Sequence, residues 1–158
     1  KSSVTLIKDH PNLIVSRTMS KAFAFAGARL GYMIANPILV EAMLLVRLPY
    51  HLSELTQAAA LAALKNRSAL QQQVEQIKQS RDLLVQELTS MGLHVISSDA
   101  NFVMFSGFEG SSQELWQRLV DKDVLIRDVG IQGYLRVTIG TEAENKLFLA
   151  ALRQALIP

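Results

Sequence analysis

Cysteine is absent from this sequence of 158 residues, and aromatic residues make up only 6% of it. The lack of cysteine excludes disulfide bonds, thiolate catalysis and cysteine-based zinc sites, and it is consistent with a reducing, cytoplasmic compartment. Histidine is also scarce. Because the spacing of His10, His51 and His94 matches no metal-ligand pattern, we expect no metal site.

The sequence also has no large excess of charge of one sign and no long apolar run. Lys and Arg number 16 against 14 Asp and Glu, which leaves a net charge of +2 with the cations scattered along the chain. This balance does not indicate nucleic-acid binding. No segment reaches the roughly 18 uncharged apolar residues that a membrane-spanning helix needs. We therefore expect neither a nucleic acid nor a membrane among the partners.

Hydrophobic residues are plentiful, at 49% of the chain, which is typical of a globular protein with a packed core. At about 150 residues per domain the length corresponds to one domain, or to one and part of another. The chain begins with Lys1 instead of methionine and enters an apolar segment at Val4 almost at once. We expect from this opening that the front of a longer protein is missing.

Short apolar runs alternate with segments that carry helix-capping signals. Strands are expected over residues 12–18, 30–35, 93–96, 101–105, 124–127 and 134–139. Helix starts are indicated by Asn36-Pro37, by Ser53, and by the capping boxes Ser68…Gln71, Ser111…Glu114 and Thr141…Glu144. The helix over 68–91 has apolar residues at spacings of three, four and seven, as an amphipathic surface helix does.

The composition shifts near residue 92, which predicts an α/β chain in three parts. Residues 1–67 are expected to be the remnant of a large domain, whose short apolar strands fit a mostly parallel sheet that is covered on both faces. Residues 68–91 form a long connecting helix. Residues 92–158 alternate strands and helices and are expected to form a small α+β domain.

Lys21 is the first candidate for chemistry, because Arg29 is the only other charged residue between it and Glu41. A lysine that follows a buried strand among small apolar residues is expected to lose hydration, which favours the neutral, nucleophilic amine. Arg29 offers a two-pronged donor for an anion, and Thr18 and Ser20 offer hydroxyl groups. This set suits an aldehyde cofactor that carries a phosphate.

Two other interpretations of the same residues stay open at this point. Lys21 and Arg29 could be ordinary surface cations that flank a turn. Ser20 and Lys21 could instead form a hydrolase dyad, although adjacent side chains usually point apart and Arg29 would then have no role.

Residues 16–32 resemble the lysine motif of the fold-type-I pyridoxal-phosphate aminotransferases. The form Thr18-x-Ser20-Lys21-Ala22-Phe23, followed by Ala26-Gly27-x-Arg29-x-Gly31, is similar to that of the histidinol-phosphate aminotransferases. Further similar motifs follow in the family's order at Pro49-Tyr50, Ser98-Asp99-Ala100-Asn101-Phe102, residues 124–128 and residues 135–141. The resemblance covers essentially the whole chain.

The resemblance implies a type-I transferase fold, with residues 1–67 belonging to the large cofactor-binding domain, and a role for each matching residue. Lys21 would carry pyridoxal 5′-phosphate as a Schiff base and move protons during catalysis. Thr18, Ser20 and Arg29 would hold the cofactor phosphate. Two residues of the small domain would bind substrates: Arg136 the carboxylate of glutamate, and Arg127 the phosphate of histidinol phosphate. Without the resemblance, both would be interpreted as surface arginines. Asn101 and Trp116 are interpreted as structural residues.

The implied reaction transfers an amino group between L-histidinol phosphate and 2-oxoglutarate or glutamate, a step of histidine biosynthesis, in a homodimer. The family's remaining cofactor contacts lie before the lysine, and Asp9 stands too close to the lysine motif to supply one. We therefore expect the whole enzyme to be roughly twice as long and this chain alone to be inactive.

Three alternatives to this function remain. An aromatic-amino-acid aminotransferase or a threonine-phosphate decarboxylase could use the same scaffold. The chain could also be a non-catalytic small-domain or dimerisation fragment.

Overall fold

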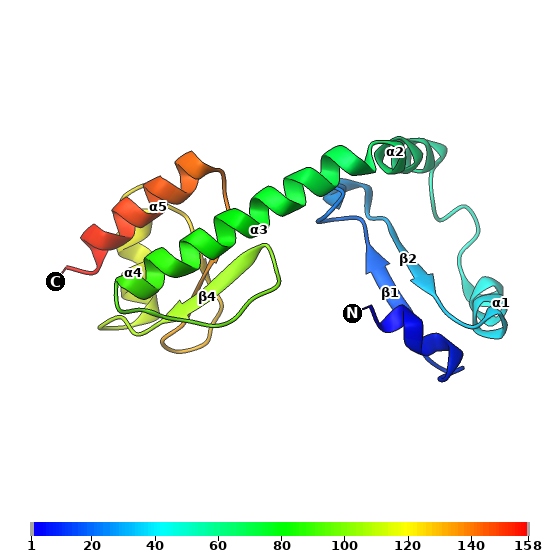
Figure 1. Ribbon diagram of the computed structural model, residues 1–158, viewed down its shortest axis with the longest axis horizontal. Coiled ribbons are helices and arrows are strands. Elements are labelled where there is room, and N and C mark those ends of the chain that lie inside the picture. The colour runs from blue at the N-terminus through cyan, green and yellow to red at the C-terminus, as the bar shows by residue number, and fades with distance from the viewer. Residues whose placement is uncertain (1, 158) are drawn as a thin grey trace. The chain divides into compact units, whose positions relative to one another are not determined.

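The computed structural model describes residues 2–157, which form two compact units, Lys1–Gln72 (unit 1) and Gln73–Pro158 (unit 2). The fold is mixed α/β, and every strand pairing among the described residues is antiparallel (Figure 1). The boundary between the units falls inside helix α3 (Arg67–Ser90). The predicted three-part organisation, with divisions at residues 67 and 92, stays a prediction.

Unit 1 contains a β-hairpin followed by helices. Its elements are the 3-10 helix η1 (Ser3–Lys8), β1 (Val15–Thr18), the 3-10 helix η2 (Ala26–Ala28), β2 (Gly31–Ile34), α1 (Pro37–Val46), α2 (Glu54–Lys65) and the start of α3. The α1 helix begins as expected, because the Asn36 side chain accepts the Ile38 N–H at 3.1 Å and Pro37 follows. In the same way, the Ser53 hydroxyl accepts the Thr56 N–H at 3.1 Å and caps α2.

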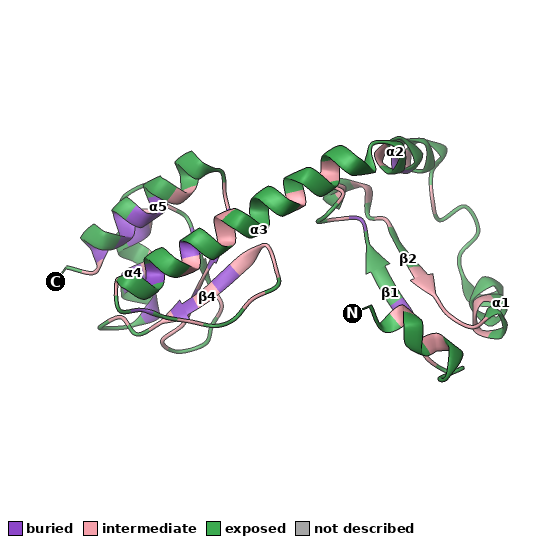
Figure 2. Cartoon of the chain, in the orientation of Figure 1, coloured by how far each residue is buried: buried purple, intermediate pink, exposed green. Residues whose placement is uncertain are grey.

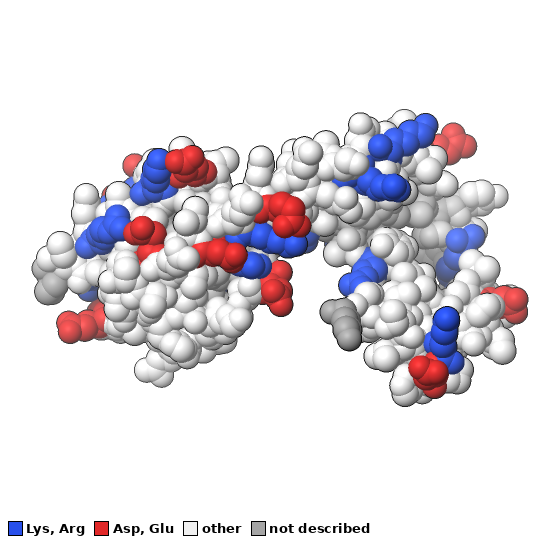
Figure 3. All heavy atoms as spheres, in the orientation of Figure 1, with Lys and Arg blue, Asp and Glu red and all other residues white. Residues whose placement is uncertain are grey.

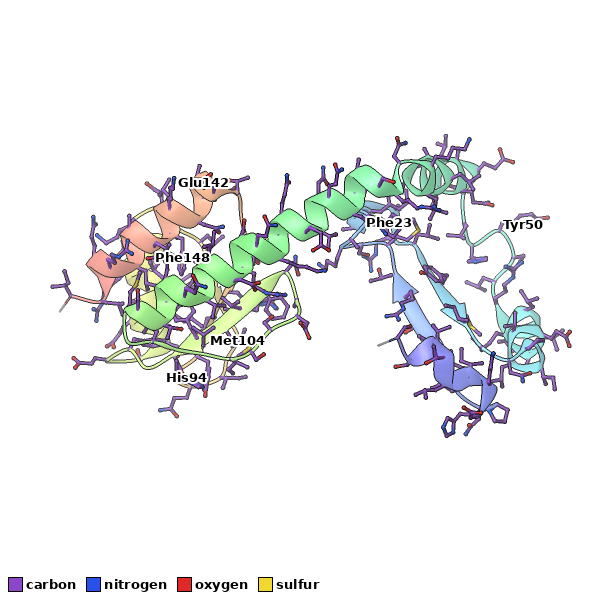
Figure 4. All side chains as sticks on the ribbon, in the orientation of Figure 1. Phe23, Tyr50, His94, Met104, Glu142 and Phe148 are labelled. Carbon is purple, nitrogen blue, oxygen red and sulfur yellow. The ribbon has the colours of Figure 1, made fainter. Side chains whose placement is uncertain are left out.

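Unit 1 buries little apolar surface among its described residues. Its buried hydrophobic residues there are Val15, Met19 and Ala60, and the residues of β1 after Val15 are exposed. Tyr50, after α1, is 99% exposed, and Figure 4 shows its side chain pointing away from the ribbon. The two strands of unit 1 are thus not covered on both faces by residues 2–72, and the covering of the large domain's sheet stays a prediction. The mostly parallel sheet of a large domain stays a prediction.

Unit 2 contains a four-stranded sheet and three helices. Its elements after α3 are β3 (His94–Val95), β4 (Phe102–Ser106), α4 (Ser112–Val120), β5 (Arg127–Asp128), β6 (Leu135–Thr138) and α5 (Glu142–Ala155). The strand order is β3-β4-β6-β5. The α3 helix ends at Ser90, just before Gly92, which has a φ of +81° and stops the helix as predicted.

The core of unit 2 lies on one face of this sheet. Because side chains alternate along a strand, Val103 and Phe105 of β4 share a face with their cross-strand partners Val137 and Leu135 of β6. All four are buried, together with residues of α3, α4 and α5, which lie beside the sheet (Figure 2). Phe148 of α5 points into this core, with its ring centroid 6.1 Å from that of Phe105 (Figure 4). The opposite face of the sheet is therefore left for other contacts.

Two capping boxes fix the starts of α4 and α5, as the sequence predicts. Ser111 and Glu114 each accept the other's backbone N–H, and Thr141 and Glu144 do the same. The N–H of Ser111 lowers the pKa of Glu114 below its ordinary value, and the N–H of Thr141 does so for Glu144. The local sequence therefore determines where each of the two helices begins.

The predicted capping box at Ser68 is wrong. The α3 helix already starts at Arg67, and the carbonyl of Asn66 accepts the Leu70 N–H at 3.4 Å. Ser68 thus lies inside the helix, where its backbone cannot adopt the extended conformation of a cap.

Two predicted strands begin three residues later than expected. The strand predicted over 124–127 begins only at Arg127, because the Val124 N–H bonds back to the Leu119 carbonyl at 3.0 Å and closes the end of α4. The strand predicted over 12–18 begins at Val15, since the Leu13 N–H closes a turn on the His10 carbonyl at 2.9 Å.

Charges of both signs are interspersed on the visible face of unit 2 (Figure 3). Across residues 2–157, no helix combines the length and apolar character that crossing a membrane would require. The same residues contain no cluster of three or more His, Asp or Glu that could hold a metal ion.

Candidate active site

The segment from Thr18 to Gly31, which we call the lysine loop, connects β1 to β2 and carries Lys21 and Arg29. The hairpin register places Thr18 directly opposite Gly31, so the two ends of the loop are held side by side. Inside the loop, Met19 is buried, and its N–H bonds to the Leu30 carbonyl at 3.1 Å. The loop is therefore a closed turn built on the two strands.

The backbone of the lysine loop is constrained at three positions. Ala24 and Arg29 have positive φ angles of 50° and 52°, a conformation that residues other than glycine adopt rarely and often at functional sites. Gly31 is required for another reason: a Cβ there would lie 2.8 Å from the Arg17 carbonyl oxygen on the neighbouring strand. These constraints hold the loop in a shape that its sequence alone would not favour.

The lysine loop contains several hydrogen-bond donors of the kinds that bind phosphate. The Thr18 hydroxyl donates to the Ser20 Oγ at 2.8 Å and accepts the Ser20 N–H at 3.1 Å, so the two predicted hydroxyl residues are together. Arg29 is exposed, and its Nη1 donates to the Ala26 carbonyl at 3.2 Å. Two hydroxyl groups, a guanidinium and the amine of Lys21 form a donor set that fits an aldehyde carrying a phosphate.

Lys21 itself is exposed among the described residues, and its carbonyl accepts the Ala24 N–H at 2.9 Å. The expected burial of the strand before Lys21 is not seen among the described residues, because β1 is exposed after Val15 and the residues around Lys21 form an exposed turn. The desolvation expected for its amine is therefore not provided by residues 2–72.

A second cluster, which we call the arginine pocket, lies in unit 2 and contains Arg127 and Arg136. The strand register pairs Arg127 of β5 directly with Arg136 of β6. Both line a pocket of about 510 Å³, and the full set of lining residues is Trp116, Leu125, Ile126, Arg127, Asp128, Arg136, Val137 and Thr138. The two arginines predicted to bind substrate are thus neighbours in one pocket.

Arg127 and Arg136 lie side by side in this pocket, which Asp128 also lines. Two like charges directly opposite each other destabilise a sheet. The ion pairs among residues 2–157 nevertheless include neither Arg127 nor Arg136. In addition, the Nε of Arg136 is buried without a hydrogen-bond partner there. Because buried donors are nearly always paired in folded proteins, the pocket has the properties of an anion site.

Trp116 and Asp128 also line the pocket, although their place in the sequence predicts no part in the site. Trp116 packs against the core as predicted, but its indole N–H also donates to the Ile126 carbonyl at 2.8 Å, next to Arg127. Asp128 accepts the Gly130 N–H at 2.8 Å and so shapes the turn after β5. The motif Ile126-Arg127-Asp128 was the available signal for Asp128, whereas Trp116 comes from a distant helix.

Comparison with known proteins decides the family. The model for aminotransferase class I and II matches residues 1–152. The chain belongs to the class I and II aminotransferases. The predicted resemblance to pyridoxal-phosphate aminotransferases is thereby confirmed, and with it the mixed α/β fold of that family.

Curated relatives of this aminotransferase chain include proteins named histidinol-phosphate aminotransferase. The protein of Paenarthrobacter aurescens is 59% identical over 155 residues, which are 98% of this chain and 41% of the relative. The protein of Streptomyces avermitilis is 54% identical over 97% of this chain and 41% of its own length. This aminotransferase chain therefore spans about two fifths of the length of these relatives.

Solved aminotransferases share the fold. The histidinol-phosphate aminotransferase of Clostridium acetobutylicum matches with a TM-score of 0.88 at 29% identity, covering 98% of this chain and 49% of that one. The enzyme of the same name from Sinorhizobium meliloti was solved in complex with pyridoxal-5′-phosphate. It matches with a TM-score of 0.83 at 29% identity, covering 97% of this chain and 43% of that one. An L-threonine-O-3-phosphate decarboxylase from Porphyromonas gingivalis also matches, with a TM-score of 0.85 at 25% identity, covering 98% of this chain and 50% of that one.

Proposed function

We propose that the protein containing this chain is a pyridoxal-phosphate-dependent transaminase that transfers an amino group between L-histidinol phosphate and 2-oxoglutarate. The observation that carries the proposal is the arginine pocket, in which Arg127 and Arg136 lie directly opposite each other and neither forms an ion pair among residues 2–157. Both substrates of this reaction are anions, one a phosphate monoester and the other a dicarboxylate. The names of the relatives at 54% and 59% identity support the same reaction.

The lysine loop supplies the cofactor-binding part of the proposal. We assign the cofactor aldehyde to the amine of Lys21 and the cofactor phosphate to Thr18, Ser20 and Arg29. The short bond between the two hydroxyl groups supports this assignment, since one phosphate can reach both. Pyridoxal phosphate, when bound, supplies an electron sink that stabilises negative charge on the substrate carbon.

The chain's own residues then divide the work of catalysis. Substrate binding releases the Lys21 amine, which removes the proton from the substrate carbon that bears the amino group and later returns a proton. Arg136 binds the carboxylate of glutamate or 2-oxoglutarate, and Arg127 binds the phosphate of histidinol phosphate. Fixed guanidinium groups hold these anions so that the reacting carbon stays within reach of the base.

Borohydride reduction of the whole enzyme with pyridoxal phosphate, followed by peptide mapping, tests the assignment of Lys21. We expect the label on Lys21 and its loss in Lys21→Ala, while Lys8→Ala, another lysine of unit 1, keeps it. A label on a different residue, or no label, would refute the assignment. The absence of any label would favour the non-catalytic fragment.

Product analysis tests the reaction. With histidinol phosphate and 2-oxoglutarate we expect glutamate to form in equal amount to the phosphorylated ketone. The structural match to a threonine-phosphate decarboxylase makes decarboxylation the second candidate. Release of carbon dioxide from phosphothreonine without formation of glutamate would decide for it, and turnover of aromatic amino acids alone would indicate the aromatic aminotransferase.

The remaining assignments also belong to the proposal. By analogy with its family, the whole enzyme would be a cytoplasmic homodimer. The 158 residues alone would be inactive or very weakly active, because the family's remaining cofactor contacts lie before the lysine and residues 2–72 leave Lys21 exposed.

A further inference from the structure

We propose that Phe102 is a positioning residue for Arg136, and that it holds the guanidinium without consuming its donors or its charge. This inference rests on the proposed function, in which Arg136 binds a substrate carboxylate. The observation behind it is the Phe102 ring, which lies against the Arg136 guanidinium with Cζ 4.6 Å from the ring centroid. Phe102 belongs to the motif Ser98-Asp99-Ala100-Asn101-Phe102, to which the proposed reaction assigns no other role.

The sheet register brings the two side chains to the same face. Phe102 is opposite Thr138, and Met104 is opposite Arg136. Because side chains alternate along a strand, all four lie on the face away from the helices, while Val103 and Val137 point into the core. Phe102 and Arg136 are therefore diagonal neighbours, within reach of long side chains, on the open face of the sheet.

An aromatic ring holds an arginine in a way that a carboxylate cannot. A carboxylate partner would occupy the N–H groups along the edge of the guanidinium and neutralise its charge. A ring contacts only the flat face, so the in-plane donors stay free for a ligand. The buried Nε of Arg136, which has no partner among the described residues, fits this arrangement. Arg136 is thus oriented, while no ion pair among the described residues takes up its charge.

Phe102 is itself held in place through its backbone. The Ser98 hydroxyl donates to the Phe102 carbonyl at 2.6 Å and accepts the Ala100 N–H at 3.1 Å. On the next strand, the Ile139 N–H donates to the Asn101 carbonyl at 2.9 Å. These bonds fix the start of β4, and with it the position from which the ring projects.

The test measures carboxylate binding separately from turnover. Glutarate has both carboxylates of glutamate but neither an amino nor a keto group, so its dissociation constant for the whole enzyme can be measured by calorimetry without reaction. For Phe102→Leu we expect this constant and the KM for 2-oxoglutarate to rise about 3- to 30-fold, with kcat nearly unchanged. Phe102→Tyr, which keeps the ring, should restore wild-type values.

Two further variants separate positioning from general packing. Met104→Leu alters the residue directly opposite Arg136 without removing a ring and should leave glutarate binding within about twofold. In an Arg136→Gln background, Phe102→Leu should have no additional effect on glutarate binding, since the two residues act as one unit.

The outcomes are distinguishable. Wild-type protein that does not form glutamate from histidinol phosphate and 2-oxoglutarate refutes the proposed function, whereas glutarate binding still tests Phe102. The inference on Phe102 is overturned if glutarate does not bind to wild-type protein, if Phe102→Leu binds it normally, or if Phe102→Tyr fails to rescue. It is overturned equally if the losses from Phe102→Leu and Arg136→Gln simply add.

Discussion

Replacing Trp116 by phenylalanine should loosen the segment that carries Arg127. The substitution removes the indole N–H that donates to the Ile126 carbonyl at 2.8 Å but keeps an aromatic ring in the core. Ile126 is buried, so its carbonyl would lose a partner that solvent cannot fully replace. We expect the free energy of unfolding to fall by about 1–2 kcal/mol.

Urea unfolding followed by circular dichroism measures this loss. With a slope of about 1–3 kcal/mol per molar urea, the midpoint of unit 2 should fall by roughly 0.3–2 M. Hydrogen exchange at residues 124–128 should also become faster. The matched control is Leu125→Ala in the same segment, because Leu125 is 79% exposed and its truncation should cost less than about 0.5 kcal/mol. An unchanged midpoint and unchanged exchange in Trp116→Phe would show that the indole bond does not hold this segment.

Two other substitutions test the lysine loop and the cap of α5. Gly31→Ala places a Cβ 2.8 Å from the Arg17 carbonyl oxygen and should lower the free energy of unfolding in urea by about 1–3 kcal/mol. The control Gly27→Ala, with open space around its Cβ, should leave stability nearly unchanged. Equal effects of the two substitutions would contradict this reasoning. For Glu144, whose pKa is lowered below its ordinary value of 4.5 mainly by the Thr141 N–H, the stabilisation is complete above about pH 4.5 and is lost as the pH falls through the lowered pKa. Glu144→Gln should therefore be less stable than wild type at pH 7, and the difference in unfolding midpoint should shrink towards pH 3; a difference independent of pH would speak against the carboxylate.

The features predicted correctly from the sequence are those decided by neighbouring residues. The capping boxes at Ser111 and Thr141 need only a hydroxyl and a carboxylate three residues apart, and both form. Ser68 and Gln71 show the related pattern of a hydroxyl and a side-chain amide, yet no box forms, because α3 begins directly after Asn66 and includes Ser68. A local pattern therefore predicts a cap only where the hydroxyl residue itself lies outside the helix, in an extended conformation.

The features that could not be predicted depend on pairing between distant residues. Arg127 and Arg136 were separate candidates in the sequence, and only the register of β5 with β6 makes them direct neighbours. The contact of Phe102 with Arg136 likewise depends on the register of β4 with β6. The roles of Lys21, Thr18, Ser20, Arg29, Arg127 and Arg136 stay predictions, which the labelling and binding experiments address.

The low aromatic content noted at the outset gives the arginine pocket an optical property. Trp116 is the single tryptophan of the 158 residues, and it lines the same pocket as Arg127 and Arg136. Light absorbed near the red edge of the protein spectrum therefore excites, within this chain, one indole beside the two cations. Its emission reports on that pocket without any attached dye.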